Sequence, residues 1–172
     1  MTLLIVFGGL PGAGKTTVAQ RIARDRAAAY LRIDEIEQAL RALGCLAGGV
    51  GPAGYMAACA LAVSNLKLGR PVVADCVNPV AASRDGWRQV AAAARARLAE
   101  VEVVCSDLAE HRARVENRSA DVPGLVPPSW AQVMAHGYEP WDGPRIVLDT
   151  AGRTIAESGR ELAARIGALM AP

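Results

Sequence analysis

Residues 8–17 read GGLPGAGKTT and place glycines, a lysine and two threonines close to the start of the chain. From Gly9 to Thr16 the stretch fits the pattern G-x-x-x-x-G-K-[ST] at every fixed position. Glycines let backbone N–H groups turn inward around a polyphosphate, and the N-terminus of a following helix attracts the same anion. We therefore expect a loop that binds a nucleoside triphosphate, made of Gly9, Leu10, Pro11, Gly12, Ala13, Gly14, Lys15, Thr16 and Thr17.

Two side chains of this loop have specific expected roles. Lys15 would reach the β and γ phosphates of the nucleotide, and the Thr16 hydroxyl would bind Mg²⁺. Of the 19 basic residues, only Lys15 and Lys67 are lysines, so the loop has a compact ammonium in a chain that otherwise uses arginine. The alternative is a glycine-rich turn that fits the pattern by chance. An apolar run before the loop and a helical pattern after it argue against that alternative.

The carboxylates that follow the apolar runs bear on what the phosphate is for. A motor-type ATPase usually has a strand that ends in Asp-Glu, whereas VVADC (72–76) and IVLDT (146–150) have no glutamate after the aspartate. A kinase instead needs a carboxylate that takes the proton of the acceptor hydroxyl. Asp34 follows the second expected strand, at the edge where parallel sheets bind ligands, and is the candidate base. Its alternative role is that of a helix N-cap.

Three further residues are candidates for the acceptor side of the site. Asp75 ends the third expected strand, and Asn78 and Arg84 follow it. Asp75 could order the water shell of Mg²⁺ or orient a basic residue near the acceptor. The alternative is a strand-end cap or a turn residue. We therefore predict that Asp75, Asn78 and Arg84 contact the acceptor together with Asp34.

A basic helical segment is expected to form a lid over the site. Arg114 and Arg118 lie one turn apart in the segment 107–118, and prolines at 123, 127 and 128 break regular structure after it. These two arginines would meet the phosphate during transfer, within a lid of about residues 107–140. The alternative is a solvated helix face on which Glu110 pairs with Arg114.

Strands and helices alternate along the rest of the chain. The apolar patterning predicts strands at 3–7, 30–33, 71–74, 101–105 and 145–148. Helices are expected from Lys15, over 34–43, 55–68, 83–98 and 107–118, and after capping boxes that start at Ser129 and Thr154. This order predicts one α/β domain over residues 1–172, with a parallel sheet covered on both faces.

The composition excludes several other classes of protein. The net charge is +2 and the arginines are scattered, so no basic stripe for nucleic acid is present. No stretch has the length of a membrane span, and the first residues lack the pattern of a signal peptide, which predicts a cytoplasmic protein. The widely spaced cysteines are expected to be small buried hydrophobes rather than a disulfide or metal framework: Cys45, Cys59, Cys76 and Cys105.

Aromatic and histidine side chains are expected to have structural roles. Trp130, Tyr138 and Trp141 could stack on a ligand ring, but packing is favoured. His111 and His136 have no partner pattern and are expected at the surface.

The motifs together resemble small P-loop kinases of the group that contains chloramphenicol phosphotransferase, zeta toxins, gluconate kinase and polynucleotide kinase. Beside the P-loop, the resemblance is carried by RIDEIEQAL, GRPVVADCVNPVAASRDGWRQVA, EHRARVENR, SWAQVMAHGYEPWD and VLDTAG. It implies a three-layer α/β sandwich with a five-stranded parallel sheet in the order 2-3-1-4-5 and a helical lid. It also implies an ATP- and Mg²⁺-dependent kinase.

The resemblance also assigns roles to single residues. Asp34 corresponds to the acceptor-side base of the group, with Asp75 and Asn78 beside it, and Arg114 and Arg118 to the lid arginines. The segment 150–153, which includes Arg153, corresponds to the part of these kinases that contacts adenine.

The chain also departs from parts of this group. Polynucleotide kinases have an arginine three residues after the catalytic aspartate, where this chain has Glu37, so a nucleic-acid acceptor is disfavoured. Zeta toxins have a longer chain and an antitoxin partner, for which nothing here argues. The predicted acceptor is a small molecule with a hydroxyl group, and a monomer and a dimer both stay open.

An ATP-binding regulator or slow NTPase switch is the alternative to a kinase. The glycine-rich loop 44–54 would wall the acceptor pocket in a kinase and face a protein partner in a switch.

Overall fold

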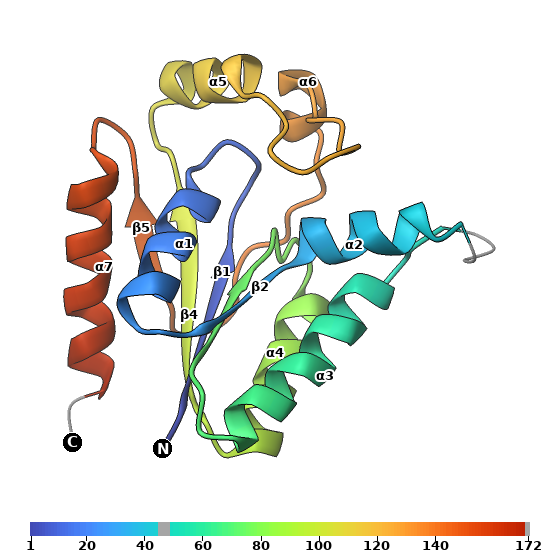
Figure 1. Cartoon of the computed structure of the whole chain (residues 1–172). Coiled ribbons are helices and arrows are strands. Elements are labelled where there is room, and N and C mark those ends of the chain that lie inside the picture. Colours follow the sequence, from blue (N-terminus) through green and yellow to red (C-terminus); the bar gives the residue numbers. More distant parts are fainter. Residues whose placement is uncertain (45–48, 171–172) are drawn as a thin grey trace.

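A parallel β-sheet forms the centre of the protein, with helices on both sides (Figure 1). The computed structural model describes residues 1–44 and 49–170, and in this part of the chain the sheet has five strands in the order β2-β3-β1-β4-β5. The strands are β1 (Leu3–Gly8), β2 (Ala29–Arg32), β3 (Val72–Asp75), β4 (Arg97–Val104) and β5 (Ile146–Asp149). Every neighbouring pair is parallel, so the expected fold class and strand order are confirmed.

The central strand β1 carries the phosphate-loop motif at its end. All six of its residues, LLIVFG, are buried, because helices cover both faces of the sheet. Phe7 pairs with Asp75 of β3 on one side and with Val101 of β4 on the other. The last residues of β1 therefore lie next to the end of β3, where a predicted site carboxylate stands.

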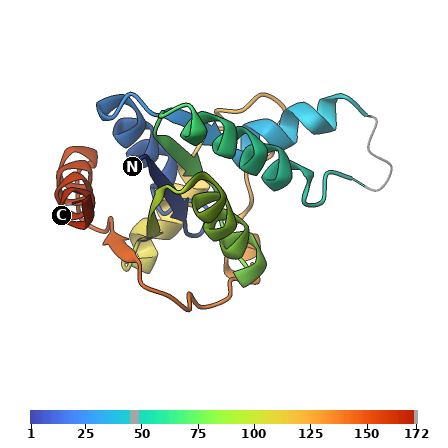
Figure 2. The same ribbon diagram turned by 90° about the horizontal axis from the view of Figure 1, so that it is seen from below.

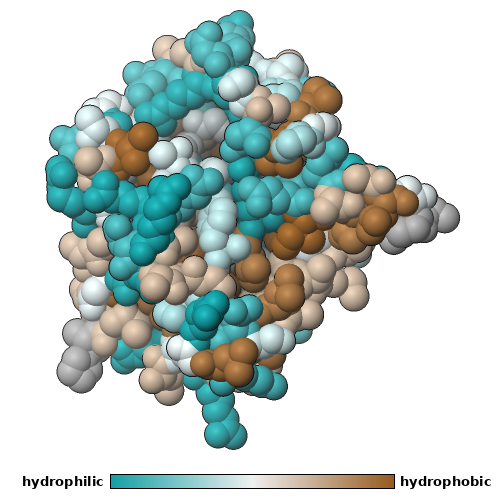
Figure 3. Space-filling view, viewed as in Figure 1, coloured by the Kyte–Doolittle hydropathy of each residue, from teal (hydrophilic) through white to brown (hydrophobic). Residues whose placement is uncertain are grey.

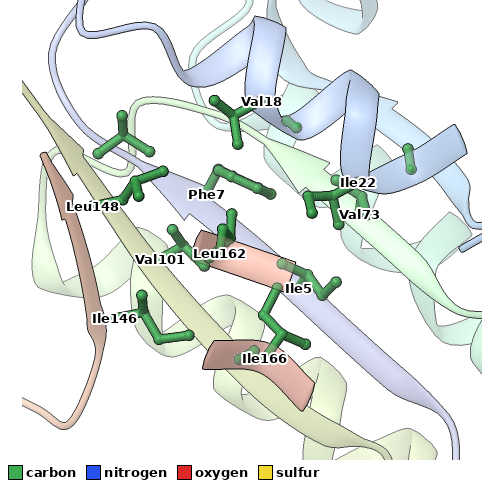
Figure 4. Close-up of a cluster of buried hydrophobic side chains, with 14 of the residues drawn as sticks. Ile5, Phe7, Val18, Ile22, Val73, Val101, Ile146, Leu148, Leu162 and Ile166 are labelled. Carbon is green, nitrogen blue, oxygen red and sulfur yellow. The ribbon is translucent and has the colours of Figure 1, made fainter. Parts of the chain in front are cut away.

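Two helical layers enclose the sheet, as Figures 1 and 2 show from two directions. On one face α1 (Lys15–Asp25) and α7 (Ile155–Met170) pack on alternate strand side chains, among them Ile5, Phe7 and Val101 (Figure 4). On the other face α3 (Ala53–Lys67) and α4 (Ala81–Ala94) pack on the intervening residues of β1. The period-two alternation of a strand thus divides one apolar run between two cores.

The remaining helices lie at the carboxyl ends of the strands. Here α5 (Leu108–Asn117) and α6 (Trp130–Met134) form the upper part of the molecule in Figure 1, and α2 (Ile33–Ala42) follows β2 directly. In Figure 3, hydrophobic residues gather over α2 and α3, whereas the surface over α5 is largely hydrophilic. The capping box predicted at Ser129 is confirmed, and Thr154 and Glu157 make the same reciprocal hydrogen bonds ahead of α7.

The end of α4 differs most from the expected helix boundaries, whereas α2, α3 and α5 differ by one or two residues. We expected a helix over 83–98, but α4 ends at Ala94, and Arg95 adopts a left-handed conformation with φ of 50°. The chain then enters β4 at Arg97, which pairs with Leu3 of β1. The alanine-rich segment has a high helix propensity, but pairing with the central strand outweighs it after Arg95.

The expectation that the cysteines are buried is confirmed for two of them. Cys76 and Cys105 are buried as predicted and Cys59 is half-buried, while Cys45 lies outside the described residues, as does part of the 44–54 loop. In residues 1–44 and 49–170, no helix has both the length and the apolar character that crossing a lipid bilayer requires.

Candidate functional site

A cavity of about 670 Å³ opens at the carboxyl edge of the sheet, between the phosphate loop and the segment 107–140, which the sequence predicts to be a lid and which is called the lid below. The loop contributes Pro11, Gly12, Gly14 and the start of α1 to its wall. The other walls come from segments far apart in the sequence, and the predicted residues among them are Asp34, Asp75, Arg114, Arg118 and Arg153. The structure therefore gathers predicted nucleotide-side and acceptor-side residues around one space.

Glycine is required at two positions of the loop for separate reasons. Gly9 has φ of 130°, and a Cβ there would collide with the carbonyl oxygen of Val103. Gly12 has φ of 84°, and a Cβ there would collide with the Val115 side chain of the lid helix α5. The loop thus packs against the sheet on one side and against the lid on the other, which side chains would prevent.

Lys15 is 8% exposed and stands at the first position of α1. Its Nζ donates a hydrogen bond to the carbonyl of Leu10, 3.0 Å away, within the same loop. Burial lowers the pKa of the amine, and the negative charges of Asp75 and Asp34 oppose this shift. The ammonium therefore lies between the phosphate loop and the two predicted acceptor-side carboxylates.

Asp75 is 3% exposed and lies at the end of β3, next to the last residues of β1. The hydroxyl of Tyr30 on the neighbouring strand β2 donates to its Oδ2 at 2.7 Å. This contact and burial raise the pKa of Tyr30 well above its ordinary value, burial being the larger cause. Tyr30 thus fixes the orientation of a carboxylate that faces the cavity.

Asp34 is not the N-cap of its helix, so that alternative is wrong. The cap position of α2 is Arg32, whose extended backbone precedes Ile33, and Asp34 is in the first turn. In the part of the chain that the structure describes, no side chain caps this helix. Asp34 has a side chain that is 42% exposed, and its Oδ2 lies 3.9 Å from Nη2 of Arg32. A carboxylate in this position can accept a proton from a group bound in the cavity.

The structure places Asn78 and Arg84 behind the cavity rather than in its wall. Asn78 is fully buried and donates through Nδ2 to the carbonyl of Phe7 at 3.0 Å. Arg84 is 1% exposed, donates to the carbonyls of Asn78 and Pro140, and stacks on the ring of Trp141. Both side chains hold the end of β1 against the 138–141 segment, and their predicted contact with an acceptor stays a prediction.

The lid arginine Arg114 connects three parts of the site. Its Nη1 donates to the Thr150 hydroxyl at 2.7 Å, and its Nη2 donates to the Thr150 carbonyl at 2.9 Å. The Thr150 hydroxyl in turn donates to the carbonyl of Ala13 in the phosphate loop. Arg114 also pairs with Glu110 at 2.6 Å, so the lid contacts and the proposed helix pair coexist.

Arg118 and Arg153 both line the cavity. Arg118 follows the last residue of α5 and lies 4.0 Å from Asp121. Arg153 is in the loop after β5 and pairs with Glu161 of α7. Arg118 is therefore the lid arginine with the longer, weaker contact in this conformation.

The sequence expectation for His111 is wrong. His111 is 5% exposed, and its Nε2 lies 2.8 Å from the carbonyl oxygen of Pro11 in the phosphate loop. Trp130 packs edge-on against the imidazole with 5.2 Å between ring centroids. His136, in contrast, is exposed as expected. No local signal distinguishes the two histidines, since the contacts of His111 come from residues 100 positions away and from α6.

Sequence reasoning missed Arg32, which ends β2 and lines the cavity. Its guanidinium forms two hydrogen bonds to the carboxylate of Asp121 in the lid, at 2.6 and 2.8 Å. Its position two residues before Asp34, at the carboxyl edge of the sheet, was the available signal.

The residues fit a metal that is held chiefly by a bound nucleotide. In residues 1–44 and 49–170 no group of three histidine, cysteine or acidic side chains is arranged to hold an ion. Thr16 lines the cavity in the first turn of α1, where its hydroxyl can supply one ligand to Mg²⁺ bound by phosphate oxygens. Asp75 and Asp34 in the same wall can bind water molecules of such an ion.

A second cavity of about 640 Å³ lies between α3 and α4. Its wall is mainly apolar, with Tyr55, Met56, Cys59 and Val63 on α3 and Val90 on α4. It contains none of the residues that the sequence assigns to chemistry.

Several solved structures share the fold over nearly the whole chain. A gluconokinase from Sinorhizobium meliloti 1021 is 23% identical with a TM-score of 0.66, covering 96% of this chain and 91% of that chain. The APS kinase CysC from Mycobacterium tuberculosis, in complex with AMPPNP and APS, is 23% identical with a TM-score of 0.69, covering 96% and 98%. Kti12 from Chaetomium thermophilum, in complex with ADP-AlF3, is 21% identical with a TM-score of 0.64, covering 98% and 100%.

The sequence comparisons agree with this fold. No curated protein matches the sequence. A family model described as an AAA domain matches residues 4–140, a range that includes the phosphate loop, Asp34, Asp75 and both lid arginines. The chain therefore belongs to this AAA domain family, and its fold is similar to that of small P-loop kinases.

Proposed function

We propose that the protein is a Mg²⁺-dependent ATP phosphotransferase that moves the γ-phosphate to a hydroxyl group of a small-molecule acceptor. The observation that carries the proposal is the single cavity with Lys15 and the loop amides on one wall and Asp34 on another. The kinases among the similar structures support it as analogy only, because a shared fold does not fix a function. With ATP as donor, we place the activity in the cytoplasm.

The nucleotide is positioned by the phosphate loop and its flanking segments. Loop amides and the N-terminus of α1 hold the triphosphate, and Lys15 moves from the Leu10 carbonyl to the β and γ phosphates. The Thr16 hydroxyl would supply a ligand to Mg²⁺, and the ion would neutralise charge on the phosphate oxygens. The 150–153 loop, fixed to the lid by Arg114, contacts the adenine end.

Asp34 acts on the acceptor. As the acceptor oxygen forms its bond to the γ-phosphorus, the bond to the β-phosphate oxygen breaks and ADP leaves. The hydroxyl proton passes to the Asp34 carboxylate, which lines the cavity and has a long contact of 3.9 Å between its Oδ2 and Nη2 of Arg32. Arg118 neutralises charge on the phosphoryl group in transfer, since among residues 1–44 and 49–170 its guanidinium pairs only with Asp121, at 4.0 Å.

The first test is transfer of label from γ-labelled ATP to a panel of sugars, nucleosides, aminoglycosides, chloramphenicol and hydroxy acids. We expect a labelled product whose formation Lys15→Ala abolishes while the thermal unfolding midpoint stays unchanged. Lys67→Ala is the matched control, because Lys67 is the other lysine of the chain and lies in the last turn of α3, outside the cavity wall. Equal turnover by Lys15→Ala and Lys67→Ala would contradict the assignment. Tight ATP binding, with no acceptor that accelerates ATP consumption, would favour the regulator or switch.

A further inference from the structure

We propose that Arg32 binds the acceptor and that the acceptor carries an anionic group, a carboxylate or a phosphate, beside the hydroxyl that is phosphorylated. The proposal rests on the phosphotransferase function for the role of the hydroxyl. It rests on the geometry of Arg32 for the anion.

Arg32 is a buried cation in the wall of the cavity. The residue is 4% exposed, and its two terminal nitrogens face one carboxylate side by side, at 2.6 and 2.8 Å. This parallel geometry is the one in which guanidinium binds carboxylate or phosphate most strongly. Its Nε is buried without a hydrogen-bond partner among the described residues, so one donor is left over. The wall therefore contains a formed anion-binding group.

The anion that now occupies this group comes from the lid. Asp121 follows α5 on the same segment as Arg118, its side chain is 50% exposed, and both residues line the cavity. Its carboxylate oxygens stand in for those of a bound acceptor. Asp121 lies in the segment between α5 and α6, outside any helix or strand, whereas Arg32 is fixed at the end of β2, so Asp121 is the partner of Arg32 that can leave.

The charges around Arg32 explain why an exchange of partners is needed. Asp34 and Glu35 lie 3.9 and 3.5 Å from its terminal nitrogens, in addition to Asp121. With all three carboxylates present, a further anion would be repelled. When Asp121 withdraws, an acceptor anion restores the charge balance and keeps both hydrogen bonds. The 3.9 Å between Arg32 and Asp34 then places a neighbouring hydroxyl of the acceptor beside the proposed base.

A lid latch without any role in binding is the competing explanation, and two variants separate them. If the pair only holds the lid closed, Arg32→Gln and Asp121→Asn both break it, so acceptor binding changes in the same direction in the two variants. As an anion site with an internal competitor, Arg32→Gln weakens acceptor binding, whereas Asp121→Asn removes the competitor and strengthens it. The opposite signs are the signature of the proposal.

The binding test uses protein saturated with AMPPNP and Mg²⁺, so that the phosphate loop is already filled. Titration calorimetry compares D-gluconate with glucose and glycerol 3-phosphate with glycerol, which distinguishes carboxylate from phosphate. We expect binding of at least one anion but not of its neutral twin. We expect Arg32→Gln to weaken it by roughly 10- to 100-fold, the range for hydrogen bonds to charged groups.

Three further proteins complete the test. Arg32→Lys keeps the positive charge but loses the two parallel donors. It should therefore also weaken anion binding, while the retained charge preserves the fold. Asp121→Asn should tighten it severalfold. Arg112→Gln is the matched control, because Arg112 pairs with Glu116 on the outer face of the lid helix and does not line the cavity. Absence of anion binding, equal binding by Arg32→Gln, or weakening by Asp121→Asn would each overturn the proposal.

Transfer assays on the same compounds keep this proposal apart from the function on which it rests. Arg32-dependent anion binding without phosphate transfer would support the anion site and contradict the phosphotransferase. Transfer to neutral acceptors with Arg32→Gln fully active would support the phosphotransferase and contradict the anion site.

Discussion

Replacement of Asp34 by asparagine tests the role of the proposed base directly. The amide keeps the size of the side chain but cannot take the acceptor proton, and loss of a general base lowers kcat by about 10²- to 10⁴-fold. ATP affinity should stay within about twofold, because the P-loop supplies the triphosphate contacts. Asp34 makes no cap hydrogen bond within the described residues, so the variant should unfold at an unchanged temperature.

The size of the stability change separates base from cap. A helix that loses an N-cap bond loses about 1 kcal/mol, which in a chain of 172 residues lowers the unfolding midpoint by about 2–4 °C. The 3.9 Å contact between Asp34 and Arg32, with Asp34 42% exposed, contributes well under that amount. A midpoint within about 1 °C of the unmodified protein is therefore expected.

The matched control is Glu35→Gln. Glu35 is the next residue in the same helical turn and approaches the same guanidinium at 3.5 Å, but it does not line the cavity. The substitution removes one negative charge near the same guanidinium but leaves the proposed base in place. Its kcat should therefore stay within about threefold of the unmodified protein. The assay is the initial rate of ATP- and acceptor-dependent product formation, with thermal unfolding of each variant. A kcat for Asp34→Asn equal to that of Glu35→Gln would refute the reasoning.

Three other changes have expected outcomes. Thr150→Val removes the hydroxyl that accepts from Arg114 and donates to Ala13, so calorimetry should show weaker AMPPNP binding, by roughly tenfold, with the fold retained. Trp87→Ala empties a fully buried position between α4 and the sheet and should lower the free energy of unfolding in urea by about 3–5 kcal/mol. The hydrogen bonds from Arg32 lower the pKa of Asp121, so their stabilisation is full above the ordinary value of 3.8 and is lost as the pH falls through the lower folded value. Acid unfolding curves should therefore show a smaller pH dependence below pH 3.8 in Asp121→Asn, and an unchanged curve would contradict this sign.

The sequence was sufficient for the features that local patterns encode. The apolar run LLIVF, the glycine-lysine motif and the alternation of strands and helices predicted the sheet, and the resemblance supplied its strand order. The same patterns brought Lys15, Asp34 and Asp75 to one edge, because all three follow parallel strands. Residues that stand at strand ends were therefore predictable as neighbours.

The sequence was insufficient where packing between distant segments decides a role. Asn78 and Arg84 come after the strand that Asp75 ends, yet both are buried beneath the 138–141 segment, where they support the fold. Arg32 and Asp121 are 89 positions apart, so no local sequence spacing could predict that they pair. Both outcomes depend on the path of the chain through the lid. The prolines of the lid interrupt regular structure, so the sequence pattern does not predict this path.

The contacts that hold the lid against the other walls of the cavity include groups that a nucleotide and an acceptor would use. Arg114 donates to the 150–153 loop, His111 contacts the carbonyl of Pro11, and Arg32 binds Asp121. Each contact is polar and directional, and each involves a residue in the cavity wall or the loop itself. With ATP and an acceptor bound as proposed, these groups would exchange hydrogen-bond partners rather than form all of their hydrogen bonds anew, and the net free energy of each exchange would be a small difference between similar terms. The balance at Arg32 is the one most easily shifted, because its present partner Asp121 has a half-exposed side chain outside any helix or strand. An acceptor that matches the carboxylate of Asp121 can take its place without leaving the buried guanidinium unpaired.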